Sequence, residues 1–245
     1  MAFERLAEID RKLHADYDEL LGDHESVFSS NTKLSWSIDF SIARTCLGRT
    51  PICSAVCYGT RRGAVQAANL DVLEKHLRVL RYFQEADAEV AAWRVVTEYE
   101  TKRMSCLRWC GVGDLTIEVV RVINVIAREY PHVRQWVVSR IPHLLAQVDR
   151  RAKNIALMFS ADQSLESALA VAEMARCQHP LVRYSFLRTD PEDPIPDGMN
   201  VVFDVRKGMP SPPSAFTCPA DAGRFPLKSD ACERCGWRCA RPLGE

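Results

Sequence analysis

Hydrophobic and polar positions follow two different periods along the first hundred residues. Residues 1–22 place apolar side chains at spacings of three and four, which predicts an amphipathic helix, and a polar loop is expected over 24–32. Residues 33–43 alternate apolar and polar side chains, which predicts a strand. The helical period returns over 64–99, with an expected break near Ala86.

From residue 104 onward, short apolar runs alternate with helical segments. The predicted strands are 104–110, 133–139, 154–160, 181–187 and 200–205. The predicted helices are 115–130, 142–150 and 165–177. Strands that alternate with helices favour a parallel sheet, and six such units fall short of a closed eight-unit barrel. We therefore predict an α/β fold whose six-strand, mostly parallel sheet is partial (β/α)6 barrel-like.

Composition divides the chain into three parts. An N-terminal helix and loop, 1–32, precede the α/β partial-barrel domain, 33–207. A Pro-, Gly- and Ser-rich linker (KGMPSPPS) then leads into a Cys-rich C-terminal extension, 208–245. This tail has too few aliphatic residues for a core of its own, so a metal or the main domain has to order it.

Charge and targeting signals narrow the classes of protein to consider. The 32 Lys and Arg residues balance 32 Asp and Glu residues, so net charge indicates no general attraction to nucleic acid or membrane surfaces. No apolar run reaches the roughly 18 residues that a membrane span needs. The charged N-terminus lacks the apolar core of a signal peptide. We predict a cytoplasmic protein without a membrane partner, in which thiols stay reduced.

Ten cysteines in a reducing compartment indicate metal ligands before disulfides. Three of them stand in the predicted loop 45–60 with the spacing C-x6-C-x3-C: Cys46, Cys53 and Cys57. Three thiolates on one loop would hold three irons of a [4Fe-4S] cluster and leave the fourth iron open, whereas a closed zinc site takes four ligands. The alternative is three buried cysteines in a loop of small residues.

The tail holds four more cysteines with the spacing C-x13-C-x2-C-x3-C: Cys218, Cys232, Cys235 and Cys239. Four thiolates close a site, and zinc and an accessory [4Fe-4S] cluster accept the same ligands. The sequence leaves zinc and iron–sulfur open at this second site. Cys110, at a predicted strand end, could join the first site, and its role is also open.

Several residues follow predicted strands at the edge where α/β proteins bind ligands. The candidates for cofactor binding are Gly111, Gly113, Asp114, Arg140 and Asp162. The glycines would let backbone approach a ligand closely. Arg140 could bind a carboxylate or phosphate, and the alternative is a surface charge. Asp114 and Asp162 each precede a predicted helix, so the alternative for both is a helix N-cap.

The cysteine loop carries a family resemblance. The run TCLGRTPICSAVCYG (45–59) resembles the Cys-Tyr signature of the phage-type gene product 88 family, whose activity is not established. The run LRWCGVGDL (107–115) resembles a strand end of that family, although Cys110 stands where its His is expected and Val112 where its Ser is. With WVVSR, FSADQS and the Cys-rich tail, the resemblance covers roughly 34–239.

A more distant resemblance suggests a function. The cysteine loop is similar to that of radical S-adenosylmethionine (SAM)-like phage proteins, and the six-unit layout resembles the partial TIM barrel of radical SAM enzymes. The resemblance implies an iron–sulfur enzyme acting on an unknown substrate, with a [4Fe-4S] cluster that binds SAM beside residues 111–114. A redox-active cluster would also need an electron donor.

The alternative comes from another functional class. A zinc-stabilised binding or regulatory module would use its cysteines for structure only, and nucleic acid would be a candidate partner. Local positive charge and one aromatic face are available for it: Arg61, Arg62, Arg234, Arg238, Arg241 and Trp237. The neutral net charge does not indicate such a partner. Metal analysis separates the two hypotheses.

Overall fold

The computed structural model describes residues 21–31, 35–57, 70–205, 216–218, Cys232 and Cys239. The predictions for the N-terminal helix, for the linker and for Cys235 lie outside these residues. Within the described residues, eight strands form one sheet: β1 (Phe28–Asn31), β2 (Ser35–Ile38), β3 (Leu107–Trp109), β4 (Gln135–Ser139), β5 (Ile155–Ala161), β6 (Val182–Arg188), β7 (Val201–Asp204) and β8 (Phe216–Thr217).

The sheet is mostly parallel and open. Strands β1 and β2 pair antiparallel, and each later pair is parallel. The order in space follows the order in the chain from β1 to β8, and the two end strands do not pair with each other. The prediction of a mostly parallel α/β sheet is therefore confirmed, but the sheet does not close into a barrel.

The strand predictions differ from the structure at both ends of the sheet. The predicted polar loop 24–32 contains β1, whose Phe28 is its one large apolar side chain. Strand β2 ends at Ile38, earlier than predicted, because the chain turns at buried Asp39 toward a short helix. Strand β8, after the linker, was not predicted. A strand can form from polar residues when a neighbouring strand satisfies its backbone, and periodicity does not detect this.

Helices connect the strands: α2 (Ile42–Thr45), α3 (Pro51–Val56), α4 (Leu70–Glu85), α5 (Ala88–Thr101), α6 (Ile117–Glu129), α7 (Pro142–Leu145) and α8 (Leu165–Cys177). The break near Ala86 is confirmed, because the Asp87 side chain accepts from the Glu89 N–H and begins α5. The helix opened by Pro142 is shorter than predicted. No helix among the described residues is both long and apolar enough to cross a membrane.

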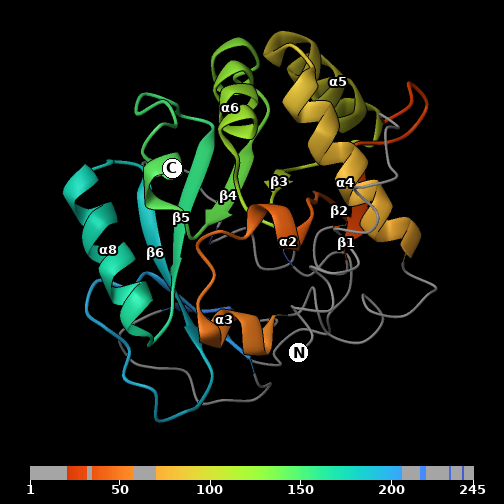
Figure 1. Ribbon diagram of the computed structural model, residues 1–245. Helices are drawn as coiled ribbons and strands as arrows, with labels where there is room; N and C mark the ends of the chain where they lie inside the picture. Colours follow the sequence, from red (N-terminus) through yellow and green to blue (C-terminus); the bar gives the residue numbers. More distant parts are fainter. Residues whose placement is uncertain are drawn as a thin grey trace.

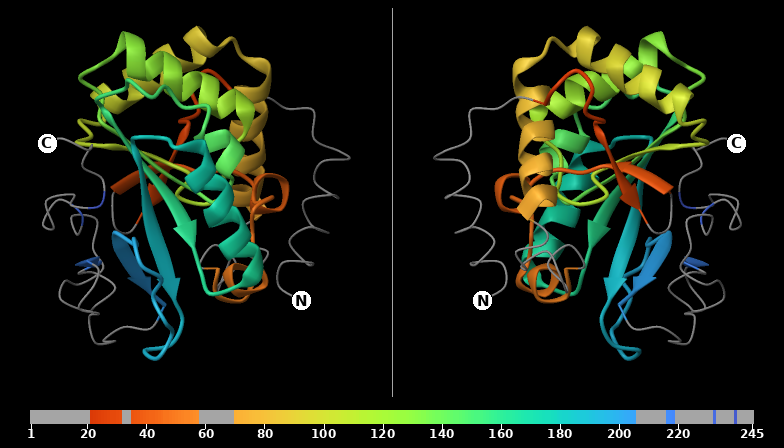
Figure 2. Two further views of the ribbon diagram at one scale, coloured as in Figure 1. Left: turned by 90° about the vertical axis from the view of Figure 1, so that its left-hand side faces the viewer. Right: turned by 90° about the vertical axis from the view of Figure 1, so that its right-hand side faces the viewer.

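The two faces of the sheet have different covers. On one face, Val137, Leu157 and Phe159 pack in the large core with α4, α5, α6 and α8. On the other, which we call the Trp136 face, Trp136 and Met158 pack with the described tail residues Cys232 and Cys239. Successive residues of a strand point to opposite faces, so β4 and β5 contribute to both layers. Figure 2 shows the helices on one side of the sheet and the blue tail residues on the other.

Candidate functional site

The carboxyl ends of β3, β4 and β5 meet the segment that contains α2 and α3 (Figures 1 and 2). Six residues form what we call the strand-edge cluster: Thr45, Thr50, Asp114, Ser139, Arg140 and Asp162. All six are buried. The first cysteine segment, predicted for the same edge as Gly113, therefore lies at that edge.

Asp114 connects three elements at this edge. Its carboxylate accepts hydrogen bonds from the Ser139 hydroxyl, the Leu115 N–H at 2.8 Å and the Arg140 N–H at 3.1 Å. Its own N–H donates to the Thr45 hydroxyl at 2.8 Å. The N-cap of α6 is Thr116, so the N-cap alternative for Asp114 is wrong. Asp114 instead joins the ends of β3 and β4 to α2.

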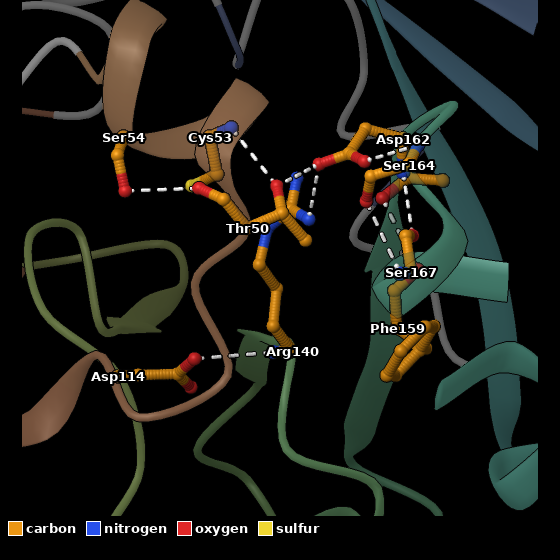
Figure 3. Close-up of polar contacts among 10 residues, drawn as sticks. Thr50, Cys53, Ser54, Asp114, Arg140, Phe159, Asp162, Ser164 and Ser167 are labelled. Atoms are coloured by element: carbon orange, nitrogen blue, oxygen red, sulfur yellow. Dashed lines mark hydrogen bonds and ion pairs between the residues drawn. The ribbon is translucent and has the colours of Figure 1, made fainter. Parts of the chain in front are cut away.

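Asp162 connects β5 to the cysteine segment through Thr50 (Figure 3). One carboxylate oxygen accepts from the Thr50 hydroxyl and from Arg140 Nη1 at 2.8 Å, and the other accepts from the Ser164 N–H at 2.9 Å. Thr50 also caps α3, where its hydroxyl accepts from the Cys53 N–H at 3.0 Å. Ser164 is the N-cap of α8, so Asp162 is not that cap. The hydrogen bonds from the Cys53 N–H to Thr50 and from the Thr50 hydroxyl to Asp162 orient α3, the helix that contains Cys53.

The pKa values of the two aspartates shift in opposite directions. Burial raises the pKa of Asp114 to about 6, more than its three hydrogen bonds lower it. Burial would also raise the pKa of Asp162, but hydrogen bonds from Ser164 and Thr50 and the charge of Arg140 outweigh it and lower that pKa. The cluster therefore contains one carboxylate held ionised and one that takes up a proton in mildly acidic solution.

The three cysteines of the first segment lie in one neighbourhood. Cys46 follows α2, Cys53 lies in α3 and Cys57 follows α3. Burial raises the pKa of the Cys46 thiol strongly, and the charges of Asp114, Cys57 and Cys53 raise it further. Cys110 is buried at the β3 end, where Asp114 and Cys46 add to the effect of burial on its pKa. The nine described cysteines form no disulfide.

This donor set fits an iron–sulfur cluster by its chemistry. Cysteine thiolates are the usual ligands of iron–sulfur clusters, and bound iron would offset the charge repulsion between them. As the structure places the described side chains, no three His, Cys, Asp or Glu residues stand together closely enough to hold a metal ion. The sulfurs of this segment would therefore have to converge when a metal binds.

The two candidate glycines bring protein segments together. A Cβ on Gly113, whose φ is +84°, would lie 2.7 Å from the Phe40 carbonyl oxygen and 2.8 Å from the Thr45 hydroxyl. A Cβ on Gly111 would overlap the side chains of Asp39 and Ser37. Both glycines thus allow the β3 end to pack against residues 37–45. Their predicted contact with a cofactor stays a prediction.

The tail cysteines lie elsewhere. Cys232 and Cys239 pack on the Trp136 face of the sheet in one cluster with Cys106, and Cys218 packs against Phe203, which also borders that cluster. The described cysteines of the two predicted groups are thus separate, those of the first at the strand ends and those of the second on a sheet face. Cys106 was not predicted as a ligand, because it belongs to neither cysteine group and only the fold brings it to Cys232 and Cys239.

Thr45, Thr50 and Ser139 were also missed. Thr50 precedes Pro51, and a threonine followed by proline is a typical start of a helix, so this signal was available. For Thr45 and Ser139 the sequence holds no such signal. Their roles depend on Asp114, which lies 69 and 25 residues away in the chain.

The raised pKa of Asp114 predicts a pH dependence of stability in the metal-free protein. Between pH 3.8, the ordinary pKa, and about 6, unfolding releases the Asp114 proton, so the free energy of unfolding should fall as pH rises. The expected loss is about 3 kcal/mol over that interval, at about 1.4 kcal/mol per pH unit. Asp162 has the opposite sign, and its contribution is lost only as pH falls below its ordinary range.

Urea unfolding of the wild type and of Asp114→Asn at several pH values measures this effect. The asparagine variant, which cannot ionise, should lack the fall in stability between pH 4 and about 6, whatever its baseline stability. The slope is the test, because the variant also changes the hydrogen bond with Arg140. An unchanged slope in Asp114→Asn would assign the pH dependence to another group.

Comparison with known proteins identifies the family. No curated protein and no solved structure matches the chain. A family model does match, and its extent, residues 10–241, includes the cysteine segment, the strand-edge cluster and the Cys-rich tail. The model is that of gene product 88, so the predicted resemblance is confirmed and the chain belongs to the gene product 88 family.

Proposed function

We propose that the chain is an iron–sulfur protein that works as a radical SAM-like enzyme at the strand-edge cluster. Cys46, Cys53 and Cys57 would hold a [4Fe-4S] cluster, which supplies one-electron chemistry through an open iron when SAM is bound. The cluster would need an electron donor, and the sequence identifies neither that donor nor the substrate. Side chains of the strand-edge cluster would position the site and keep water from it.

One observation carries the proposal: the cysteine segment is attached to the ends of the parallel strands at two points. Thr45, just before Cys46, accepts from the Asp114 N–H at 2.8 Å. Thr50, three residues before Cys53, donates to Asp162. Ligands and cofactors of open parallel sheets bind outside the carboxyl ends of the strands. The thiols are thus held at the edge where a reactive site is expected.

The strand-edge cluster would position this site and keep water from it. Arg140 lies close enough to Cys53 to lower the pKa of its thiol, against the larger effect of burial. The Arg140 guanidinium is almost fully buried and is oriented by Asp162. A buried cation beside the cysteine helix would favour thiolate at Cys53 and would attract an anionic group such as the SAM carboxylate.

The layout of the sheet supports the radical SAM-like part of the proposal. From β2 onward the strands are parallel and follow one another in space as they do in the chain. A barrel that had been opened between two strands would have this order. The comparison with an opened barrel concerns the strands from β2 onward and does not include the Cys-rich tail or α2–α3.

Anaerobic purification followed by iron analysis tests the proposal. The wild type should be brown and contain at least about four irons per chain, the content of one cluster. Replacing Cys46, Cys53 and Cys57 together by serine should remove that amount, while the matched variant Cys177→Ser, at the end of α8, should keep it. After reduction, the wild type should cleave SAM to 5′-deoxyadenosine and the triple variant should not.

Two results would contradict the proposal in different ways. Colourless protein with stoichiometric zinc in the triple variant and the wild type alike would favour the zinc-stabilised module. Iron present without SAM cleavage would leave an iron–sulfur protein that is not a radical SAM enzyme. The Cys110→Ala variant decides the role of Cys110, because loss of the cluster there would make it a fourth ligand and leave no open iron.

A further inference from the structure

The Trp136 face of the sheet gathers four cysteines from distant parts of the chain. Cys106 is 3% exposed and precedes β3, while Cys239 is 7% exposed and comes from the tail. Both pack in one cluster that Cys232 borders. Cys218 is buried next to Phe203 at the margin of that cluster.

Two buried hydrogen-bond donors on this face have no acceptor among the described residues. One is Trp136 Nε1, on a side chain that is 3% exposed, and the other is Arg108 Nε. They are neighbours, since the Arg108 guanidinium lies 4.5 Å from the centre of the Trp136 ring. An unpaired buried donor is costly, so native proteins rarely keep one without a ligand, ion or water that accepts its hydrogen.

The charges around Cys106 suit an anionic ligand. Arg134 and Arg108 are the positively charged neighbours of the Cys106 thiol, and Arg108 also lies over the Trp136 ring. A metal ion with four thiolate ligands carries net negative charge on its sulfurs, which accept hydrogen bonds. The thiols would bind the metal ion, and the nearby cations and unpaired donors would stabilise the negative charge on the sulfurs.

We propose that Cys106 is a ligand of a metal–thiolate centre that it shares with Cys218, Cys232 and Cys239, and that Trp136 and Arg108 donate hydrogen bonds to its sulfurs. Each thiol would release its proton to solvent and give a sulfur lone pair to a thiophilic ion, zinc or the iron of a cluster. The described sulfurs are not yet grouped to hold an ion, so binding would draw the tail toward Cys106.

The centre would attach the tail to the main domain. Cys106 is part of the sheet domain, so a shared ion forms a cross-link between β3 and residues more than a hundred positions later. The Trp136 face would then contact a metal-stabilised segment. This site is separate from the strand-edge cluster and does not rest on the proposed function.

Cobalt binding to the full-length chain tests the proposal. In a background where Cys46, Cys53 and Cys57 are serine, Co²⁺ should bind with a thiolate-to-cobalt absorption band whose intensity reports the number of sulfur ligands. Cys106→Ser should reduce that band and weaken Co²⁺ affinity, whereas Cys177→Ser in the same background should change neither. Metal analysis of the same proteins as purified shows whether zinc or iron is lost with Cys106.

A second variant keeps the proposal testable if Cys106→Ser does not fold. Trp136→Phe retains the ring and removes the N–H, and it should weaken Co²⁺ binding about tenfold, as loss of a hydrogen bond to a metal ligand does. Wild-type affinity and band intensity in Cys106→Ser would overturn the ligand assignment. Unchanged affinity in Trp136→Phe would overturn the donor role.

Discussion

Replacing Asp162 by alanine is expected to lower the free energy of unfolding by about 3 kcal/mol or more and to loosen the cysteine segment. The Asp162 side chain is fully buried, and that of Arg140 is 10% exposed. Removing the carboxylate leaves the Arg140 charge buried without its counter-ion, which typically costs about 3–5 kcal/mol. The same change removes the acceptor of the Thr50 hydroxyl.

Urea unfolding and limited proteolysis measure the two parts of this effect. Cleavage within residues 46–57 should become faster in Asp162→Ala, because Thr50 no longer links the α3 N-terminus to β5. Arg151→Ala is a matched control, since Arg151 pairs with Asp149 while 91% exposed. Its expected cost is at most about 1 kcal/mol. Equal losses of unfolding free energy in the two variants would mean that the buried Arg140–Asp162 pair does not contribute the predicted stability.

Replacing Asp204 by alanine should destabilise the fold by a similar amount, about 3–5 kcal/mol. Asp204 at the end of β7 accepts from Arg188 Nε at 2.7 Å and from Arg188 Nη2 at 3.0 Å. The two side chains are 0% and 3% exposed, so this pair is even more buried than Arg140–Asp162. A two-bond pair also fixes the guanidinium plane between the ends of β6 and β7.

The double variant Arg188→Met with Asp204→Leu separates charge from packing. If the cost of Asp204→Ala comes from the stranded Arg188 charge, the double variant should recover most of the lost stability in urea unfolding. A double variant as unstable as the single one would instead show that the pair is needed for packing or for its other contacts. Iron content in both variants would show whether this end of the edge supports the cysteine segment.

Local periodicity predicted the elements that are long and strongly patterned. The predicted helix 165–177 has the bounds of α8, because its first turn is capped by Ser164 and its apolar spacing is unbroken. The predicted strand 154–160 lies within one residue of β5 at each end. Strand β5 is buried along nearly its whole length, whereas α8 buries Met174 and leaves Leu165 and Leu169 exposed.

Short or polar elements were not predicted. Strand β1 has a serine at two of its four positions, and it forms because β2 satisfies its backbone in an antiparallel register. The segment expected to be a loop, 45–60, holds α3, which depends on the Thr50 cap and Pro51. Elements of this size contribute little apolar pattern, and their stability comes from partners elsewhere in the chain.

The sequence by itself determined the family, the two cysteine groups and the kind of residues at the strand ends. The cysteine spacings and the Cys-Tyr run are local features, and they suffice for the family assignment that the match over residues 10–241 confirms. The alternation of strands and helices likewise determined the mostly parallel α/β class.

Only the tertiary structure decided which of these residues meet. Thr50 contacts Asp162 across 112 positions of the chain. Asp114, a possible helix cap by sequence, instead joins the ends of β3 and β4 to α2. Cys106, far from the tail cysteines in the sequence, lies in one cluster with Cys232 and Cys239 on the Trp136 face. Side-chain contacts of this kind depend on strand pairing and on the face to which each residue points, and these are properties of the whole sheet that no local pattern contains.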